Sequence, residues 1–355
     1  MSVRAWSAAV AAVLLGAAAA GCSSGGSASS SADGGVTMPI VHGLEATNLT
    51  VSDFPAIDSG GLYVAENDGF FAKEGLHVTI VPDFTSSQDT VDKIESDKAQ
   101  ISSGDYVTYM NDLVGQDSNI MIVAEGSVLQ PNVLALMAGP ESKIRSLKQL
   151  EGKAIPISGI HDIGSLLIDS VLTDNNVPFS SVHYVPGIPL PAVPALVDQG
   201  KFTAGPVPEP FVSEGEEQEG DTILADLDQG ATTDFPIVGY SVTRQWAQRN
   251  PNTLKAFVTA LEEGQEVADT NRPALEKALE GKPLKVPVDV DAIISLPSFP
   301  TGVDPVRLQR VMSDMIEFGF FTGKQLTAAK DFRAKNVVYT ANLANANGQT
   351  SLLGG

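Results

Sequence analysis

Cysteine is almost absent from the sequence, which contains one among 355 residues. A single thiol excludes an intramolecular disulfide framework and a cysteine-rich zinc site. The four histidines are scattered, and no two of them have the spacing of metal ligands. The P-loop motif G-x-x-x-x-G-K-[ST] and the zinc-protease motif H-E-x-x-H are both missing. The sequence therefore predicts a protein that is not an enzyme and that holds no metal and no cofactor.

Positive charge is also scarce: the sequence contains 22 Lys and Arg and 43 Asp and Glu, which gives a net charge of −21. This balance excludes a nucleic-acid partner, which needs a cationic surface, and adhesion to anionic lipid by charge alone. With 43% hydrophobic and 18% charged residues, the chain has the composition of a folded protein. A chain of this length usually divides into two hydrophobic cores.

The N-terminus has the features of an export signal, predicted over residues 1–21. Arg4 precedes an apolar run, Ala8–Ala20, which is shorter than the roughly 20 residues of a membrane-spanning helix. The segment Ala19-Ala20-Gly21-Cys22 resembles a bacterial lipobox, in which the cysteine becomes the lipid-modified first residue. An ordinary secretory signal with an accidental cysteine is the alternative. Residues 22–36, rich in Gly and Ser, are predicted as the lipidated Cys22 and a flexible tether.

Strand and helix patterns alternate along the rest of the chain, which is typical of an α/β fold with mainly parallel sheets. Predicted strands cover residues 36–46, 77–81, 100–103, 120–124, 153–157, 182–185, 203–207 and 237–242. Predicted helices cover residues 60–73, 86–97, 106–114, 164–175, 192–199, 250–271, 273–279, 304–318 and 327–333. Because the alternation restarts near residue 153, we expect two lobes. Lobe 1 is predicted over 37–126 and 238–345 with the C-terminal helices, lobe 2 over 127–237, and a disordered tail over 346–355.

Five segments in the same order resemble the solute-binding proteins of ABC importers for sulfonates, taurine, nitrate and thiamine precursors. They are Gly61–Ile80 (GLYVAENDGFFAKEGLHVTI), Ile101–Asp105 (ISSGD), Ser142–Lys153 (SKIRSLKQLEGK), Val207–Phe211 (VPEPF) and Arg249–Phe257 (RNPNTLKAF). The resemblance implies a two-lobed, type II periplasmic-binding-protein-like fold with a ligand cleft between the lobes. It also implies a monomeric lipoprotein on the outer face of the cytoplasmic membrane, with an ABC permease and its ATPase as partners. Pro208 stands where this family usually has Trp.

Polar residues follow several predicted strands, at the edge where an α/β sheet opens to a ligand crevice. Free N–H groups at the start of the next helix favour an acceptor there. For some of these residues a structural role is the alternative: Tyr63 as core, Asp105 and Asp162 as helix caps, and Glu209 as a charge at a helix start. The predicted ligand-binding residues are Asp58, Tyr63, Ser103, Gly104, Asp105, Ser127, Asn132, Ser158, His161, Asp162, Gly164, Ser165 and Glu209.

These loops carry four carboxylates and no Lys or Arg, so they suit a zwitterion or an amino-heterocycle better than an inorganic anion. We therefore expect a taurine-like or pyrimidine-like solute. Two other functions stay open. The first is a pyrimidine-synthase-like enzyme on the same fold, although that family carries a cysteine-rich iron motif that this sequence lacks. The second is an exported ligand-sensing protein without a role in transport.

Overall fold

The structure is a computed structural model that describes residues 43–115 and 118–339. The predicted signal segment, Cys22, the tether and the tail lie outside these residues. In the part of the chain that is described, no helix is both long and apolar enough to cross a bilayer.

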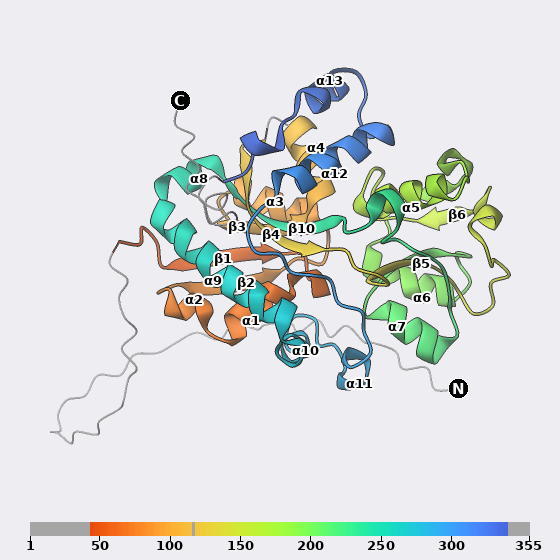
Figure 1. Ribbon diagram of the computed structural model, residues 1–355, viewed down its shortest axis with the longest axis horizontal. Helices are drawn as coiled ribbons and strands as arrows, with labels where there is room; N and C mark the ends of the chain where they lie inside the picture. Colours follow the sequence, from red (N-terminus) through yellow and green to blue (C-terminus); the bar gives the residue numbers. More distant parts are fainter. Residues whose placement is uncertain (1–42, 116–117, 340–355) are drawn as a thin grey trace, which may run out of the picture. The chain divides into compact units, whose positions relative to one another are not determined.

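Lobe 1 is built on a five-stranded sheet in the order β2-β1-β3-β10-β4. Its strands are β1 (Asn48–Asp53), β2 (His77–Pro82), β3 (Ile101–Asp105), β4 (Ile120–Val128) and β10 (Pro236–Thr243). β1 is parallel to β2 and β3, whereas β10 is antiparallel to β3 and β4. β4 and β10 are buried along almost their whole length, which explains their largely apolar sequences. Figure 1 shows β10, a strand from late in the chain, inserted between two early strands.

Helices cover this sheet, and many come from the C-terminal third of the chain. They are α1 (Gly60–Asn67), α2 (Phe70–Lys73), α3 (Ser87–Glu95), α4 (Tyr106–Gly115), α8 (Arg244–Arg249), α9 (Pro251–Thr270), α10 (Arg272–Leu279), α11 (Val288–Asp291), α12 (Pro305–Glu317) and α13 (Gly323–Asp331). Helix α9 packs on α1 so closely that a Cβ added at Gly264 would collide with the carbonyl oxygen of Gly61. The predicted packing of the C-terminal helices on lobe 1 is thus observed for α9.

Lobe 2 contains two small sheets, with β5 antiparallel to both β8 and β9, and β6 parallel to β7. Its elements are β5 (Leu134–Ala138), β6 (Ala154–Pro156), α5 (Ile163–Asp174), β7 (His183–Val185), α6 (Val193–Asp198), β8 (Gly205–Pro208), α7 (Phe211–Glu214) and β9 (Thr222–Asp226). The chain enters this region after β4 and leaves it before β10. At this point Gln130 Nε2 donates to Asp234 Oδ1 over 3.0 Å, which joins the two crossing segments.

Several sequence predictions need correction. Of the strand predicted over residues 36–46, residues 36–42 lie outside the described residues and 43–46 are irregular; the first described strand is β1 at residues 48–53. The helix predicted over residues 60–73 is two helices, because Gly69 adopts a left-handed conformation (φ 74°) that breaks it. The sheets are mixed: β10 alone runs against the other four strands of the first sheet, and β5 runs against β8 and β9 in lobe 2. β5 and β9 were not predicted. Strand direction depends on which distant strands pair, and local periodicity carries no information about that.

Candidate functional site

The end of β1 carries a buried carboxylate, Asp53, that was not among the predicted site residues. Ser59 Oγ donates to its Oδ1 over 2.7 Å, and the Tyr63 hydroxyl donates to its Oδ2 over 2.5 Å. Burial raises the pKa of Asp53, although these hydrogen bonds act in the opposite direction. Tyr63 is only 3% exposed, so its ring belongs to the core and its hydroxyl is used as a hydrogen-bond donor to Asp53. The signal available in the sequence was a carboxylate after the alternating apolar residues Leu49 and Val51.

Asp58 and Ser127 lie together, although 69 positions separate them in the sequence. The buried hydroxyl of Ser127, in β4, donates to Asp58 Oδ1 over 2.7 Å. Burial raises the pKa of the half-buried Asp58, and the nearby Asp53 charge adds to the shift. Ser103 is buried at the end of β3, with its Oγ 3.4 Å from that of Ser59. The fold therefore brings the predicted residues of β3, β4 and the start of α1 around one acidic pair, Asp53 and Asp58.

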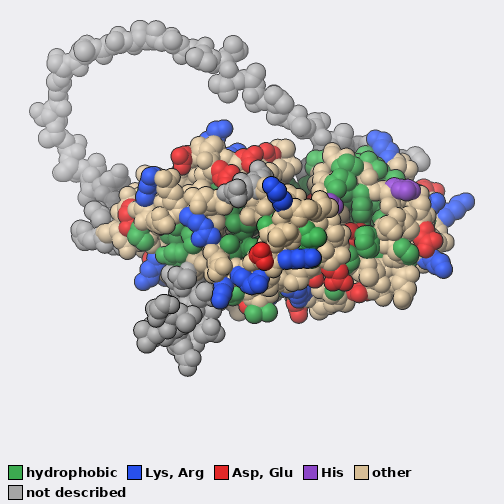
Figure 2. Space-filling model, turned by 90° about the horizontal axis from the view of Figure 1, so that it is seen from above, with side chains coloured by type: hydrophobic (Ala, Val, Ile, Leu, Met, Phe, Trp, Pro, Cys, Tyr) green, Lys and Arg blue, Asp and Glu red, His purple; other side chains and the backbone are tan. Residues whose placement is uncertain are grey.

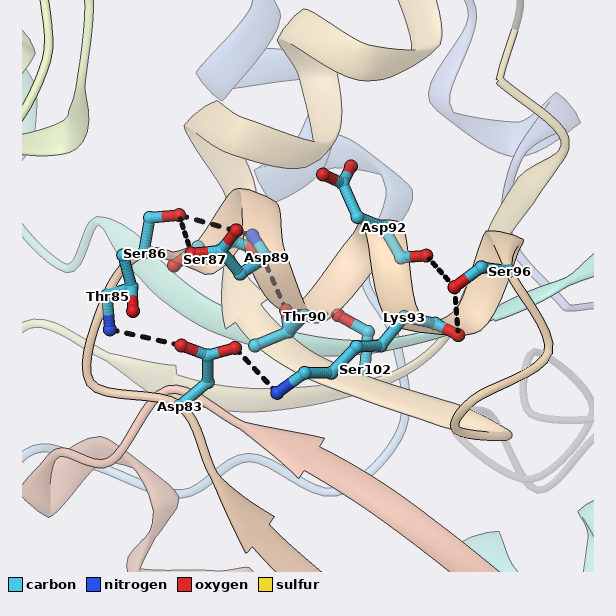
Figure 3. A network of polar contacts seen from close by, with 10 residues as sticks. All are labelled: Asp83, Thr85, Ser86, Ser87, Asp89, Thr90, Asp92, Lys93, Ser96 and Ser102. Atoms are coloured by element: carbon cyan, nitrogen blue, oxygen red, sulfur yellow. Dashed lines mark hydrogen bonds and ion pairs between the residues drawn. The ribbon is translucent and has the colours of Figure 1, made fainter.

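The start of α3 supports this edge of the sheet through a polar network (Figure 3). Thr90 Oγ1 lies 2.6 Å from Ser102 Oγ, and Lys93 Nζ lies 2.7 Å from Asp83 Oδ2. Ser87 Oγ accepts a hydrogen bond from the backbone N–H of Asp105 over 3.2 Å. These contacts hold the end of β3 against α3. An added Cβ at Gly104 would approach Ser87 and Thr90 within 3.2 Å, so this residue is confined by packing.

Asp105 has the geometry of a helix cap at the start of α4. Its Oδ1 accepts from the backbone N–H of Thr108 over 2.8 Å, and its Oδ2 accepts from the Thr108 hydroxyl over 2.8 Å. Asp105 therefore acts as a helix cap, which was the structural alternative to ligand binding given for this residue from the sequence. The side chain remains partly exposed, so capping does not remove Asp105 from the surface of lobe 1.

Asp162 occupies the N–H groups that the sequence analysis assigned to a ligand. Its Oδ1 accepts from Ser165 N over 2.8 Å, and its Oδ2 accepts from Ser158 N over 2.9 Å and Gly159 N over 3.0 Å. The Ser165 hydroxyl turns back to the carbonyl oxygen of Asp162, and Gly164 is buried beside the same carboxylate. Asp162 is therefore the N-cap of α5 and also closes the loop before this helix.

Asp162 also interacts with a carboxylate of lobe 1. Burial raises the pKa of Asp162, and the charge of Asp105 raises it further. The helices that these carboxylates cap lie against each other, because Asn111 of α4 donates to the carbonyl oxygen of His161 just before α5. In the described part of the chain, no Lys or Arg forms an ion pair with Asp58, Asp105 or Asp162. This edge of the two lobes consequently carries negative charge without a compensating cation.

His161 makes contact between the lobes. Its carbonyl oxygen accepts from Asn111 Nδ2 of α4 over 3.2 Å, and its ring stacks on Phe320 with centroids 4.6 Å apart. Burial lowers the pKa of His161, whereas the Asp162 charge raises it. A pocket of about 270 Å³ lies beside this contact. It is lined by Asn111, Gly115, Ile160, His161, Phe320, Phe321 and Gln325.

Glu209 and Asn132 are placed differently from the residues above. Glu209 is 4% exposed and accepts from Ser213 N (3.0 Å), Ser213 Oγ (2.6 Å) and Ser295 N (2.8 Å). Burial raises the pKa of Glu209 despite these bonds. Asn132 is exposed in the turn between β4 and β5. Within the described residues, no hydrogen bond or ion pair joins Glu209 or Asn132 to another predicted site residue.

Buried carboxyl groups predict that the protein becomes more stable as the pH falls below 8. Burial raises the pKa of Asp169 and Asp314 to about 6, and burial with the Asp198 charge raises that of Asp221 to about 7. The native state therefore binds more protons than the unfolded state between about pH 4 and pH 7. Stability falls as the pH rises through this window, and the melting temperature should be higher at pH 5.5 than at pH 8.

Thermal unfolding in buffers of equal ionic strength checks this prediction. Asp221→Asn should weaken the pH dependence, because it removes the group with the highest of these pKa values. Asp97→Asn, at an exposed position, is the matched control. A melting temperature that rises steadily from pH 5.5 to pH 8 would contradict the prediction.

The described residues contain no group of three or more His, Cys, Asp or Glu side chains that could hold a metal ion. The arrangement is instead a set of carboxylate and hydroxyl groups at strand and helix ends of two lobes. Such a set can bind a solute by hydrogen bonds and charge.

Comparisons with known proteins agree with this architecture. The nitrate-binding protein NrtA of Synechocystis PCC 6803 superposes with a TM-score of 0.70 at 17% identity, covering 86% of this chain and 90% of that chain. The alkanesulfonate-binding protein SsuA of Xanthomonas axonopodis pv. citri superposes with a TM-score of 0.68 at 13% identity, covering 84% and 99%. These similarities establish the two-lobed periplasmic-binding-protein fold.

A sequence relative and a family match extend the comparison. The nitrate import ATP-binding protein NrtC of Synechocystis sp. PCC 6803 is 25% identical over 247 residues, which are 65% of this chain. The chain spans only 36% of the length of that relative. Residues 56–274, more than half of the chain, match the NMT1/THI5-like family. The chain therefore belongs to the NMT1/THI5-like family, as the resemblance in its sequence implied.

Proposed function

We propose that the protein is the solute-binding component of an ABC importer and that it captures a small organic solute between its two lobes. The family match, and the binding activity named for structural neighbours such as NrtA and SsuA, support this role. The observation that carries it is the contact between the lobes at the hydrogen bond from Asn111 of α4 to the carbonyl oxygen of His161 (3.2 Å). This contact brings the start of α5, capped by Asp162, to α4, whose first turn is capped by Asp105. A solute held there touches both lobes and stabilises their closed arrangement.

The solute that fits best carries an amino group. A sulfonate or nitrate needs N–H donors, and Asp162 already accepts from Ser165 N in the first turn of α5 and from Ser158 N and Gly159 N in the loop before it. A protonated or amino-substituted ring would instead compensate the carboxylates, which no Lys or Arg pairs with among the described residues. Of the two solute classes predicted from the sequence, the pyrimidine-like class is therefore favoured over the taurine-like class.

Export and anchoring complete the proposal. The signal segment and Cys22 favour a lipoprotein on the outer face of the cytoplasmic membrane, where a tethered receptor can deliver its solute to a permease. Binding and release need no covalent chemistry, so the protein is proposed to be a receptor and not an enzyme. The pyrimidine-synthase-like alternative would require turnover of the bound solute.

A thermal-shift screen of the chain from Ser23 onward tests the solute class. The ligands are 4-aminopyrimidine, thiamine, taurine, methanesulfonate and nitrate. A ligand that binds only the native state stabilises it by about 2.7 kcal/mol at a hundredfold excess over Kd. We expect the amino-heterocycles to raise the melting temperature and nitrate and methanesulfonate to leave it unchanged. The largest shift with nitrate or methanesulfonate would contradict the proposed solute class, and consumption of a ligand would contradict the receptor role.

A further inference from the structure

A second recess lies away from the acidic edge, between α12 and the short 3-10 turn Ala334–Asn336 (η7). Its volume is about 510 Å³. The side chains of Val306, Gln309, Arg310, Ser313, Arg333 and Lys335 are among those that line it. We call this recess the basic groove.

Three basic side chains, Arg310, Arg333 and Lys335, line the basic groove, although acidic residues outnumber basic ones by 43 to 22 in the whole chain. Arg333 and Lys335 are exposed, and neither forms an ion pair with a described residue. Arg333 Nη1 is fixed by the carbonyl oxygens of Lys330 (3.0 Å) and Phe332 (2.6 Å), so its charge is held in place. Figure 2 looks down on the side where α13 lies, and several Lys and Arg side chains are in view across its middle.

Arg310 forms the inner wall of the basic groove. Its Nη2 donates to the carbonyl oxygen of Thr233 over 2.6 Å, and its guanidinium lies 5.2 Å from the centroid of the Phe235 ring. Its Nε is buried and has no hydrogen-bond partner among the described residues. Asp228 and Asp314 are the carboxylates whose charges interact with it. Because Thr233 and Phe235 belong to the crossing from lobe 2 into β10, the groove adjoins the connection between the lobes.

The rim of the groove also exposes an apolar side chain. Val306, in the first turn of α12, is 76% exposed beside Pro305. A surface that combines fixed cations with an exposed aliphatic group is complementary to a peptide that carries carboxylates beside an apolar residue. An anionic membrane fits less well, because an extended bilayer faces a wide area of a protein with a net charge of −21. A short peptide in the groove interacts mainly with charges within about 10 Å, because salt screens those farther away.

We propose that the basic groove docks an acidic, apolar-bearing polypeptide segment of a partner protein. This inference goes beyond solute binding and does not depend on the solute class. Carboxylates of the segment pair with Arg333 and Lys335, and its apolar side chain covers Val306. The segment then lies next to the crossing that joins the two lobes.

Fluorescence anisotropy with the whole chain from Ser23 tests the proposal. The probes are a labelled ten-residue peptide of eight Glu and two Leu, and its counterpart with Gln in place of Glu. We expect the Glu peptide to bind, the Gln peptide to bind at least about tenfold more weakly, and the affinity to fall with salt. The double variant Arg333→Glu/Lys335→Glu should weaken binding of the Glu peptide at least about tenfold.

Two further variants separate docking from general charge effects. Lys148→Glu/Lys153→Glu makes the same change of net charge at exposed positions of lobe 2 and should leave binding unchanged. Val306→Glu adds one repulsive charge on the groove rim and leaves Arg333 and Lys335 unchanged. It should also weaken binding of the Glu peptide. Equal binding of the Glu peptide by the groove and control double variants would overturn the proposal. So would equal binding of both peptides, or groove-dependent binding of phosphatidylglycerol vesicles in the absence of peptide binding.

Discussion

Replacing Glu125 by alanine is expected to lower the free energy of unfolding by about 3 kcal/mol, because it leaves Arg307 without its buried partner. Glu125 is fully buried in β4, and its Oε2 lies 2.8 Å from Arg307 Nη2. Its Oε1 accepts from the backbone N–H of Asp304, which caps α12. The variant therefore removes both the ion pair and an acceptor at the start of that helix. Arg307 is one-third exposed (33%), so water recovers part of the loss.

Urea denaturation measures this effect, and two variants calibrate it. Glu125→Gln keeps an acceptor for Asp304 N but loses the charge, so its stability should lie between those of the wild type and the alanine variant. Glu263→Ala removes an exposed ion pair with Lys73 (2.8 Å) and should cost less than about 1 kcal/mol. Should Glu125→Ala prove no more harmful than Glu263→Ala, the buried pair does not anchor α12.

Asp58→Asn is expected to weaken binding of an amino-bearing solute about 100-fold, because it removes a half-buried charge from the acidic edge. Asparagine is of similar size, and its oxygen can still accept from the Ser127 hydroxyl, which lies 2.7 Å from Asp58 Oδ1. The fold should therefore be kept while the electrostatic attraction is lost. Isothermal titration with the strongest ligand of the thermal-shift screen gives the affinity.

The matched control is Asp68→Asn, which removes one negative charge at an exposed position just after α1. Its affinity should stay within about twofold of the wild type, because water and salt screen a charge at the surface. If Asp58→Asn also stays within twofold, Asp58 does not contact the solute, and the proposed placement of the amino group is wrong.

Long periodic segments made the α/β fold readable from the sequence. The strand at His77–Pro82 and the helix α9 (Pro251–Thr270) lie within a few residues of their predicted limits. Burial on two faces or on one stripe leaves a pattern in consecutive residues, so such elements can be predicted locally. β5 (Leu134–Ala138, LALMA) and β9 (Thr222–Asp226, TILAD) were missed, because Leu, Ala and Met favour helices and few residues of either strand are β-branched. Their pairing with each other, and that of β5 with β8, makes them strands.

The structure brings some of the predicted site residues together and places others elsewhere. The sequence indicated that polar groups follow the strands, and the structure brings Asp58, Ser103 and Ser127 around Asp53. It could not show that Asp53 would be the shared acceptor, or that Glu209 would be satisfied by Ser213 and Ser295. Ser295 lies 86 positions from Glu209, so only the folded chain brings the two together. The partners of Asp53 are 6 and 10 positions away, but the direction of their side chains depends on how the turn after β1 packs. Whether each carboxylate contacts a solute is a prediction for the binding experiments.

The sequence by itself determined the composition, the absence of the searched catalytic motifs, the alternation of strands and helices and the family resemblance. These properties belong to single residues or to short runs, so they do not require knowledge of distant contacts. Only the tertiary structure decided that β10 enters the first sheet antiparallel, that Asp162 accepts from Ser165 N, and that Asn111 of α4 contacts His161. Each of these depends on through-space distances between atoms, which the order of residues along the chain does not specify.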